Sequence, residues 1–289
     1  MILIVDSGST KCDWIAVDQH GEQCFEKVRT EGLNPAILTD KKLTKIIKKS
    51  EVLMNHKKQV EHIFFYGAGC GTPKPRQMLT EVLESIFKKA VVEVQEDTMA
   101  AVRACINSPD ESAVVCILGT GSNCSFFDGQ KIHQRVDSLG FSIMDDASGN
   151  YFGRQLLRDY YFNHMPDHLK TAFSKAYNVE AVYIKFNLYK KPNPIAYLAS
   201  FAEFMFSHKE EPYISQLIKS GIEIFYKNMI HQFKDVLDRV PVHFAGSIAY
   251  FSKEEIEQVA TEQGFTLGNF ARRPIEGLLR YHVDQLRDL

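Results

Sequence analysis

A glycine-cornered β-hairpin pattern occurs twice in this sequence, and the repeat restricts the fold more than any other feature. The first copy has an apolar strand over residues 2–5, a turn through Gly8 and a second strand over residues 13–18. The second has an apolar strand over residues 113–118, a turn through Gly119 and Gly121, and a strand over residues 124–127. One strand–turn–strand order at two distant places predicts two similar domains, each opened by such a hairpin.

The rest of the chain predicts alternating strands and helices, as expected for an α/β fold. Before the second hairpin, the pattern predicts strands over residues 23–30, 60–66 and 91–95, and helices over residues 39–54, 75–89 and 98–106. After it come a strand over residues 131–136, helices between residues 145 and 235, a strand over 240–245, and helices over 253–262 and 274–286.

The net charge of the chain argues against nucleic acid and membranes as partners. The chain has 289 residues, of which 34 are Lys or Arg and 36 are Asp or Glu, so the net charge is −2. A nearly neutral chain gives no electrostatic reason to bind nucleic acid or a membrane surface, and we expect neither partner. We expect a small-molecule substrate, and the oligomeric state stays open, with a homodimer among the alternatives.

The sequence also favours a cytoplasmic location. Its start lacks the basic segment and long apolar run of a signal peptide, and no apolar run is long enough to span a membrane. None of the six cysteines form a Cys-x-x-Cys pair, which is typical of free thiols in a reducing compartment.

Glycine turns of this kind can hold phosphate groups. Successive N–H groups in a tight turn, together with Ser and Thr hydroxyls, form an anion cradle. The first turn carries Asp6, whose carboxylate could hold Mg²⁺ through water. A third corner, Gly246-Ser247, ends an apolar strand. Taken singly, the first two turns favour ordinary β-hairpins, and the third is equally compatible with an ordinary strand-to-helix turn. Neither of the first two is a P-loop or a dinucleotide fingerprint.

Together, the three corners, the repeat and Asp97 after a strand resemble the actin, sugar-kinase and heat-shock-ATPase superfamily. Within it, the likeness is to the N-acetylglucosamine kinase-like family and the related activator ATPases of acyl-CoA reductases and dehydratases, over nearly the whole chain. The motifs that carry it are Asp6-Ser7-Gly8-Ser9-Thr10-Lys11, Glu96-Asp97-Thr98-Met99-Ala100-Ala101, Leu118-Gly119-Thr120-Gly121-Ser122-Asn123 and Phe244-Ala245-Gly246-Ser247.

The resemblance implies two actin-like (ribonuclease H-like) domains, each with a mixed five-stranded sheet, and a nucleotide cleft between them. The first would span residues 1–107, with the C-terminal helix 275–289 packing back on it, and the second would span 108–274. ATP and Mg²⁺ would be the cofactors. The reaction would transfer the γ-phosphoryl group to a hydroxyl of an amino sugar, N-acetylglucosamine or a close relative.

The resemblance also implies a role for individual residues. Asp97 would be the catalytic base on the acceptor hydroxyl, although an Asp at this place could instead cap a helix. The ATP- and phosphate-binding residues would be Asp6 (with the metal), Gly8, Ser9, Thr10, Lys11, Gly119, Thr120, Gly246 and Ser247. The substrate-binding residues would be Asn34, Gly121, Asn123, Gly140 and Asp145.

The expected acceptor loop departs from the family pattern, which reads roughly Trp-Gly-His-x-x-Gly-Asp-Glu-Gly-Ser. Here Leu139 and Phe141 replace the tryptophan and the histidine, and two glycines are replaced as well. The acceptor therefore stays open, as a related molecule or one that is not a sugar. Two alternative functions remain. One is an activator ATPase with an iron–sulfur cluster on Cys70 and Cys124, and the other is a non-catalytic sugar sensor.

Overall fold

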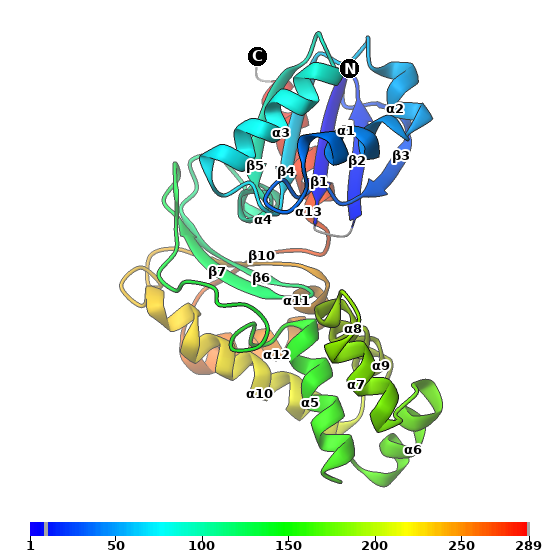
Figure 1. Cartoon of the computed structure of the whole chain (residues 1–289). Coiled ribbons are helices and arrows are strands. Elements are labelled where there is room, and N and C mark those ends of the chain that lie inside the picture. Colours follow the sequence, from blue (N-terminus) through cyan, green and yellow to red (C-terminus); the bar gives the residue numbers. More distant parts are fainter. Residues whose placement is uncertain (9–10, 288–289) are drawn as a thin grey trace. The chain divides into compact units, whose positions relative to one another are not determined.

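The chain forms two compact units in a computed structural model that describes residues 1–8 and 11–287. The first unit comprises Met1–Ile106 together with the segment from Arg273 onward, and the second comprises Asn107–Arg272. Each unit is built around its own five-stranded sheet (Figure 1).

The sheet of the first unit has the order β3-β2-β1-β4-β5. β1 pairs antiparallel with β2 and β2 with β3, whereas β1 pairs parallel with β4 and β4 with β5. Four consecutive buried apolar residues, Ile2 to Val5, explain the central place of β1, because only a strand covered on both faces buries them all. The strands are β1 (Ile2–Ser7), β2 (Lys11–Val17), β3 (Gln23–Glu31), β4 (His62–Gly67) and β5 (Val91–Glu96).

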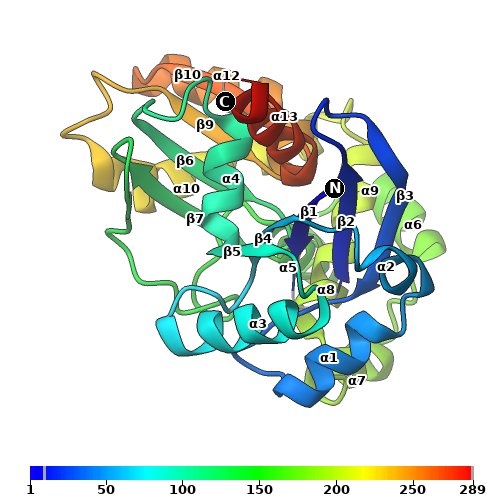
Figure 2. The same cartoon turned by 90° about the horizontal axis from the view of Figure 1, so that it is seen from above.

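Helices cover both faces of this sheet. Leu3 and Val5 of β1 pack with α1 and α3 in one apolar cluster, while Ile2 and Ile4 pack with α4 and α13 in another. This alternation follows the two-residue period of a strand. Figure 2 shows α13 beside α4, and α1 and α3 on the other side of the sheet. The helices are α1 (Asp40–Lys48), α2 (Glu51–His56), α3 (Pro73–Ile86), α4 (Asp97–Cys105) and α13 (Pro274–Arg287).

The second unit repeats the first in strand order and direction. Its sheet is β8-β7-β6-β9-β10, with β6 antiparallel to β7, β7 antiparallel to β8, and β6, β9 and β10 parallel. The predicted two-fold repeat is thereby confirmed, because β6 and β7 take the places of β1 and β2. The strands are β6 (Ala113–Leu118), β7 (Ser122–Phe127), β8 (Ile132–His133), β9 (Val242–Ala245) and β10 (Leu267–Ala271).

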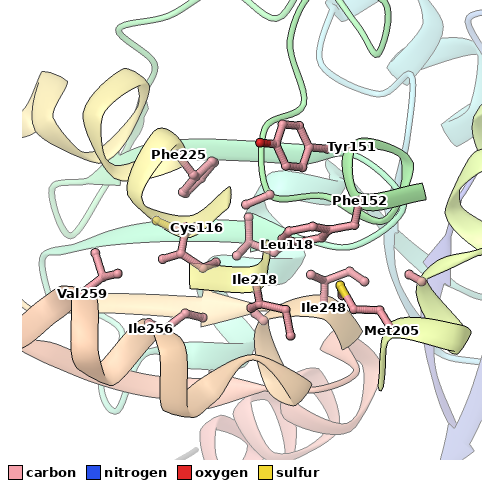
Figure 3. Packing of buried hydrophobic residues seen from close by; sticks show 14 of the residues in the cluster. Cys116, Leu118, Tyr151, Phe152, Met205, Ile218, Phe225, Ile248, Ile256 and Val259 are labelled. Carbon is pink, nitrogen blue, oxygen red and sulfur yellow. The ribbon is translucent and has the colours of Figure 1, made fainter. Parts of the chain in front are cut away.

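A helical insertion between β8 and β9 distinguishes the second unit. Its core joins Cys116 and Leu118 of the sheet to Phe152 and Phe225 of the insertion and to Ile256 of α12 (Figure 3). No helix of the described residues combines the length and apolar composition that crossing a membrane requires. The helices are α5 (Gly149–Tyr161), α6 (Asp167–Ala176), α7 (Ala181–Tyr189), α8 (Pro194–Ser200), α9 (Ala202–Ser207), α10 (Pro212–Asn228), the 3₁₀ helix η1 (Ile230–Phe233), α11 (Ser247–Phe251) and α12 (Lys253–Gln263).

Two predicted elements were wrong in extent. The single helix predicted over residues 39–54 is two helices, because Ser50 leaves the helical conformation and its hydroxyl accepts the Leu53 N–H at 3.4 Å. The strand predicted over residues 131–136 is only the two-residue β8, since the chain turns away beyond His133. The first error lies where a serine hydroxyl offered the backbone another hydrogen-bonding partner.

A network of hydrogen-bonded polar side chains links α13 to the sheet of the first unit. The ring of His282 is 2% exposed and stacks on Phe64 with 3.8 Å between centroids. Its Nε2 lies 2.8 Å from the Tyr66 hydroxyl, which also receives a hydrogen bond from Arg103. Arg103 in turn pairs with Glu93 at 2.8 Å. The hydroxyl can donate to Nε2 only if His282 is neutral.

We expect His282 to make stability fall in mild acid. Burial, with a smaller effect of the Arg103 charge, lowers its pKa from 6.5 to about 3. Below pH 6.5 His282 therefore binds a proton in the unfolded chain but stays neutral in the folded protein. The stability that comes from the neutral, buried His282 is present above pH 6.5 and is lost as the pH falls. The loss is about 2 kcal/mol between pH 6.5 and 5.

Urea unfolding at pH 7 and pH 5 checks this. The His282→Gln variant should lose less stability between the two pH values than the wild type does. His20→Gln, at an exposed turn of the same unit, is the matched control and should keep the wild-type pH dependence. An identical pH dependence in wild type and His282→Gln would contradict the assignment.

Candidate functional site

Three parallel strands of the first unit end at one edge of its sheet. The register aligns Ser7 of β1, Gly67 of β4 and Glu96 of β5. The carboxyl ends of parallel strands are where α/β proteins bind ligands. Asp6 and Asp97, which are far apart in the sequence, are thus brought to the same edge.

Asp6 carries an unusual electrostatic environment. Burial above all, and then the charges of Asp13 and Asp97, raise the pKa of its carboxyl to about 6, against the opposing charge of Lys11. Three carboxylates within electrostatic reach of one another make an environment that a cation would stabilise. This is the chemistry expected of a site that takes Mg²⁺.

Asp97 is the first residue of α4 and is not the cap of that helix. The N-cap position belongs to Glu96, so the alternative reading of Asp97 as an N-cap was wrong. The surrounding protein raises the pKa of Asp97, and the charge of Glu96 adds to the shift, although the side chain keeps an exposed edge. A carboxylate that is reachable and more basic than usual suits proton acceptance.

The turn between β1 and β2 is closed by a hydrogen bond from the Gly8 N–H to the Lys11 carbonyl at 3.0 Å. Gly8 and Lys11 are exposed, so this turn can be reached by a ligand. Ser9 and Thr10, also predicted to bind phosphate, lie outside the described residues.

The loop of Asn34 is tied to the same edge. The Leu33 N–H donates to the Ser7 hydroxyl at 2.9 Å, directly beside Asn34. The Asn34 side chain is 9% exposed, and its Oδ1 accepts the Ala36 N–H at 2.9 Å. Gly69 allows this placement, because a Cβ there would lie 2.0 Å from that oxygen. The amide is therefore held in one orientation.

In the second unit, the turn between β6 and β7 is fixed from two sides. The Gly119 N–H donates to the Gly121 carbonyl at 2.9 Å, which closes the turn. The start of α5 holds it from outside, since the Gly149 N–H donates to the Gly119 carbonyl at 2.8 Å and the Asn150 N–H to the Thr120 carbonyl at 3.1 Å. The Thr120 side chain and the open space at Gly119 face outward, where a ligand can approach.

Asp145 is brought against this turn. Its backbone is left-handed at φ 67°, in a loop where Gly140 has φ 81° and Ala147 has φ 55°. A side chain at Gly121 would begin 2.9 Å from the Asp145 carboxylate, so the two predicted substrate residues are neighbours. Left-handed residues without glycine cost energy and tend to mark functional loops.

Asn150, which the sequence analysis missed, organises this constellation. It is completely buried, and its Nδ2 donates to the Thr120 carbonyl at 2.7 Å and to the Asp145 carboxylate at 3.0 Å. Its own Oδ1, like the Oδ1 of Asn123, is buried without a hydrogen-bond partner among the described residues. The available signal was an amide within the apolar first turns of α5.

A small cavity of about 230 Å³ opens beside Asp145. Asp146 also lines it and accepts a hydrogen bond from the Asn228 amide at 2.8 Å, which ties the loop to the end of α10. Gly140, the remaining predicted substrate residue, does not line this cavity. The lining residues are Ser122, Val136, Ser138, Ile143, Met144, Asp145, Asp146, Asn228 and Met229.

The third corner follows β9, where Gly246 has φ 110° and Ser247 begins α11. A Cβ at Gly246 would lie 2.3 Å from the Leu118 carbonyl, at the end of β6. Only glycine therefore lets this corner approach the β6–β7 turn, so that Gly246 lies beside Gly119. The Ser247 side chain is exposed.

We expect Gly246→Ala to lower both stability and nucleotide affinity. The added methyl group must push β6 and β9 apart at the corner, at a cost of about 3 kcal/mol. Gly264→Ala is the matched control: that glycine is also left-handed, at φ 74°, but has open space around it, so only the backbone cost of about 1 kcal/mol applies. Equal urea midpoints for the two variants would contradict the close approach.

These residues fit a bound nucleotide and its metal. Gly119 borders open space, and Asn123 offers a buried acceptor that has no hydrogen-bond partner among the described residues. Asp6 supplies the hard oxygen ligand that Mg²⁺ prefers. In the first unit Asp6, Gly8 and Lys11 would face phosphate and metal, and in the second Gly119, Thr120, Gly246 and Ser247 would face the nucleotide.

The two cysteines considered for an iron–sulfur cluster do not fit that role. Cys70 is fully buried, and burial raises the pKa of its thiol to about 12. Cys124 is 1% exposed, with its sulfur 3.6 Å from that of Cys116. A cluster shared between subunits needs thiolates at the surface, and neither side chain offers one.

Comparisons with known proteins agree with this geometry. A protein from Porphyromonas gingivalis described as a "Putative N-acetylglucosamine Kinase" is 34% identical, with a TM-score of 0.89 over 98% of this chain and 99% of its own. A second protein so described, from Chromobacterium violaceum, has 15% identity and a TM-score of 0.66 over 97% of this chain and 98% of its own. A ROK family glucokinase from Streptomyces griseus, solved with glucose and AMPPNP, has 14% identity and a TM-score of 0.57 over 99% of this chain and 100% of its own.

The last two likenesses show the fold, and the first also shows the family. No family model and no curated protein matches the sequence. On the identity and coverage of the Porphyromonas gingivalis protein, the chain belongs to the N-acetylglucosamine kinase-like family of ATP-dependent sugar kinases with the actin-like fold.

Proposed function

We propose that the protein transfers the γ-phosphoryl group of ATP to a hydroxyl of an amino sugar, N-acetylglucosamine or a close relative. The observation that carries the proposal is the placement of Asp97 at the same sheet edge as Asp6 and its turn, as an exposed carboxylate with a raised pKa. The glycine turns of each unit would contribute contacts to the nucleotide. The free cysteines and the use of ATP favour a cytoplasmic location.

In the proposed mechanism the protein mainly positions groups. Asp97 orients the acceptor hydroxyl and accepts its proton as the new bond to phosphorus forms. The backbone N–H groups of the glycine turns hold the phosphates and stabilise the charge that develops on them. Asp6 would hold Mg²⁺ through water, and the metal, when bound, neutralises charge on the transferring group.

The amino-sugar acceptor is supported by residues from both units. Asn34 presents a fixed amide, and Asp145 is a carboxylate held by Asn150 beside Gly121. The amide can donate and accept hydrogen bonds and the carboxylate can accept them, which suits sugar hydroxyls as ligands of each residue. The Porphyromonas gingivalis relative, described by the same activity, supports the N-acetylated substrate. Leu139 is 62% exposed on the acceptor loop and replaces the family's tryptophan.

A coupled ADP-release screen tests the proposal. The panel holds N-acetylglucosamine, other amino sugars, neutral hexoses and acyl-CoA pathway components, each with ATP and Mg²⁺. We expect ADP release with N-acetylated amino sugars well above the rate with ATP alone. Release only with neutral hexoses would refute the amino-sugar acceptor. If no sugar in the panel raises ADP release above the rate with ATP alone, the kinase proposal is refuted and the non-catalytic sugar sensor is favoured.

We expect Asn34→Ala to raise KM for the sugar at least tenfold, with a smaller effect on kcat, because a binding amide is lost before the chemical step. Asn34→Asp is the discriminating variant, because it keeps the oxygen that accepts the Ala36 N–H and removes only the amide donor. Steady-state kinetics should show a raised KM for both. A wild-type KM in Asn34→Asp would mean that Asn34 serves only to shape its loop.

A further inference from the structure

The second unit contains a larger cavity that the proposed reaction does not use. Its volume is about 620 Å³, which lies in the range of small-molecule sites. Figure 1 shows α5, α7 and α8, which supply most of its wall, and α8 contacts both of the others. We call it the α5–α7 cavity; it is lined by Phe141, Ser142, Arg154, Leu157, Arg158, Tyr161, Phe162, Ile184, Leu188, Tyr189, Pro194 and Leu198.

The walls of the α5–α7 cavity are largely apolar and aromatic, and they are open to solvent. Tyr161, Phe162 and Tyr189 are 44%, 59% and 77% exposed. Exposed aromatic side chains gathered around a hollow are costly to leave in water, and in soluble proteins they mark binding sites. The cavity shares no lining residue with the smaller cavity beside Asp145.

The charge in this cavity has one sign. Arg154 and Arg158 are four residues apart, so they lie on one face of α5. The Arg154 guanidinium donates to the Phe141 carbonyl at 2.9 Å, and that of Arg158 lies over the Phe162 ring at 5.4 Å. All the lining residues are described, and none is Asp or Glu. No ion pair involves Arg158 within the part of the chain that the structure describes.

The sequence around the cavity also has an excess of positive charge. Residues 149–200 contain seven Lys or Arg and three Asp or Glu, in a chain whose net charge is −2. Lys185, Lys190 and Lys191 lie on or directly after α7. A second copy of this chain seated face to face would bring two basic surfaces together, which disfavours a homodimer through this patch.

We propose that the α5–α7 cavity binds a small amphipathic anion, with its apolar body against the aromatic walls and its carboxylate or phosphate on Arg158. A neutral sugar matches neither feature, so this ligand differs from the acceptor. Phe141 and Ser142 belong to the loop that carries Asp145, and the bound anion therefore contacts that loop directly.

Two fluorescent probes test the binding. The anionic dye 1-anilinonaphthalene-8-sulfonate should bind at one site per chain, and Arg158→Gln should weaken it at least tenfold. The neutral dye N-phenyl-1-naphthylamine should lose less than about threefold in the same variant. Tyr189→Ala should weaken both dyes. Decanoate should displace the anionic dye, and decanol at the same concentration should not.

Arg272→Gln is the matched control, because Arg272 also covers an aromatic ring, that of Phe251 at 4.9 Å, but does not line the cavity. Titrations are repeated with saturating AMPPNP to keep the dye from a nucleotide site. Unchanged dye affinity in Arg158→Gln, or an effect of Arg272→Gln instead, would overturn the proposal. So would sedimentation showing a dimer that Tyr189→Ala dissociates, since the patch would then be a subunit interface.

Discussion

Asp97→Asn is expected to lower kcat by about 10²-fold or more while leaving the melting temperature near that of the wild type. The amide keeps the size of the side chain but cannot accept a proton from the acceptor hydroxyl. Stability should hold because Glu96, and not Asp97, occupies the N-cap of α4. ATP affinity should change little, since the proposed phosphate contacts come from the glycine turns.

Glu96→Gln is the matched control for this experiment. It removes the same charge one residue earlier, from a side chain that raises the pKa of Asp97 but is not the proposed base. We expect its kcat to stay within a few-fold of the wild type. A wild-type kcat for Asp97→Asn on the true acceptor would show that the mechanism is wrong, whatever the fold.

Asn150→Asp is expected to lower the free energy of unfolding by about 3 kcal/mol. The substitution replaces an amide that donates to the Thr120 carbonyl and the Asp145 carboxylate with a buried group that can only accept when ionised. Two acceptors and a new negative charge would then face one another without solvent. Urea unfolding at pH 7 measures the loss.

The matched control is Asn178→Asp, which makes the same chemical change at an exposed position. There the side chain only accepts, from the Glu180 N–H at 3.0 Å, and a carboxylate does so equally well. We expect a change within about 0.5 kcal/mol. Where enough Asn150→Asp protein folds, KM for the sugar should rise more than KM for ATP, because Asp145 has lost its support. Equal urea midpoints for the two variants would contradict the role of Asn150.

The sequence predicted the hairpins well for a physical reason. β1 and β6 are buried on both faces and read as unbroken apolar runs that end at glycines. β10 was missed because it is a half-buried strand at the edge of the sheet with no such run. It even contains Gly268, where a Cβ would lie 2.1 Å from the His243 ring, so a residue that normally weakens a strand is required here by packing.

The residues of the candidate site also differ in how well the sequence indicated them. Asp6 stands out because it directly follows an apolar run and Asp97 because it follows a strand, and the parallel sheet brings such positions together. Asn150 gave only a weak signal, an amide among apolar residues, because the sequence does not show that its partner Thr120, 30 residues away, lies beside it. The sequence also gave no sign of the left-handed φ angle of Asp145, because neither adjacent residue is a glycine of the kind that indicates a turn.

The packing of α13 has a consequence for biosynthesis. The apolar cluster of Ile2, Ile4 and Tyr66 is completed by Leu278, so the first unit needs residues from both ends of the chain. A ribosome makes Met1–Ile106 early but adds α13 only after the 166 residues of Asn107–Arg272, about 10–30 s later at ordinary rates of translation. During that interval α4 alone covers the apolar face that it later shares with α13, so part of that face stays exposed. The half of the protein that is translated first is therefore the half that finishes folding last, and its exposed strands offer a chaperone a defined target.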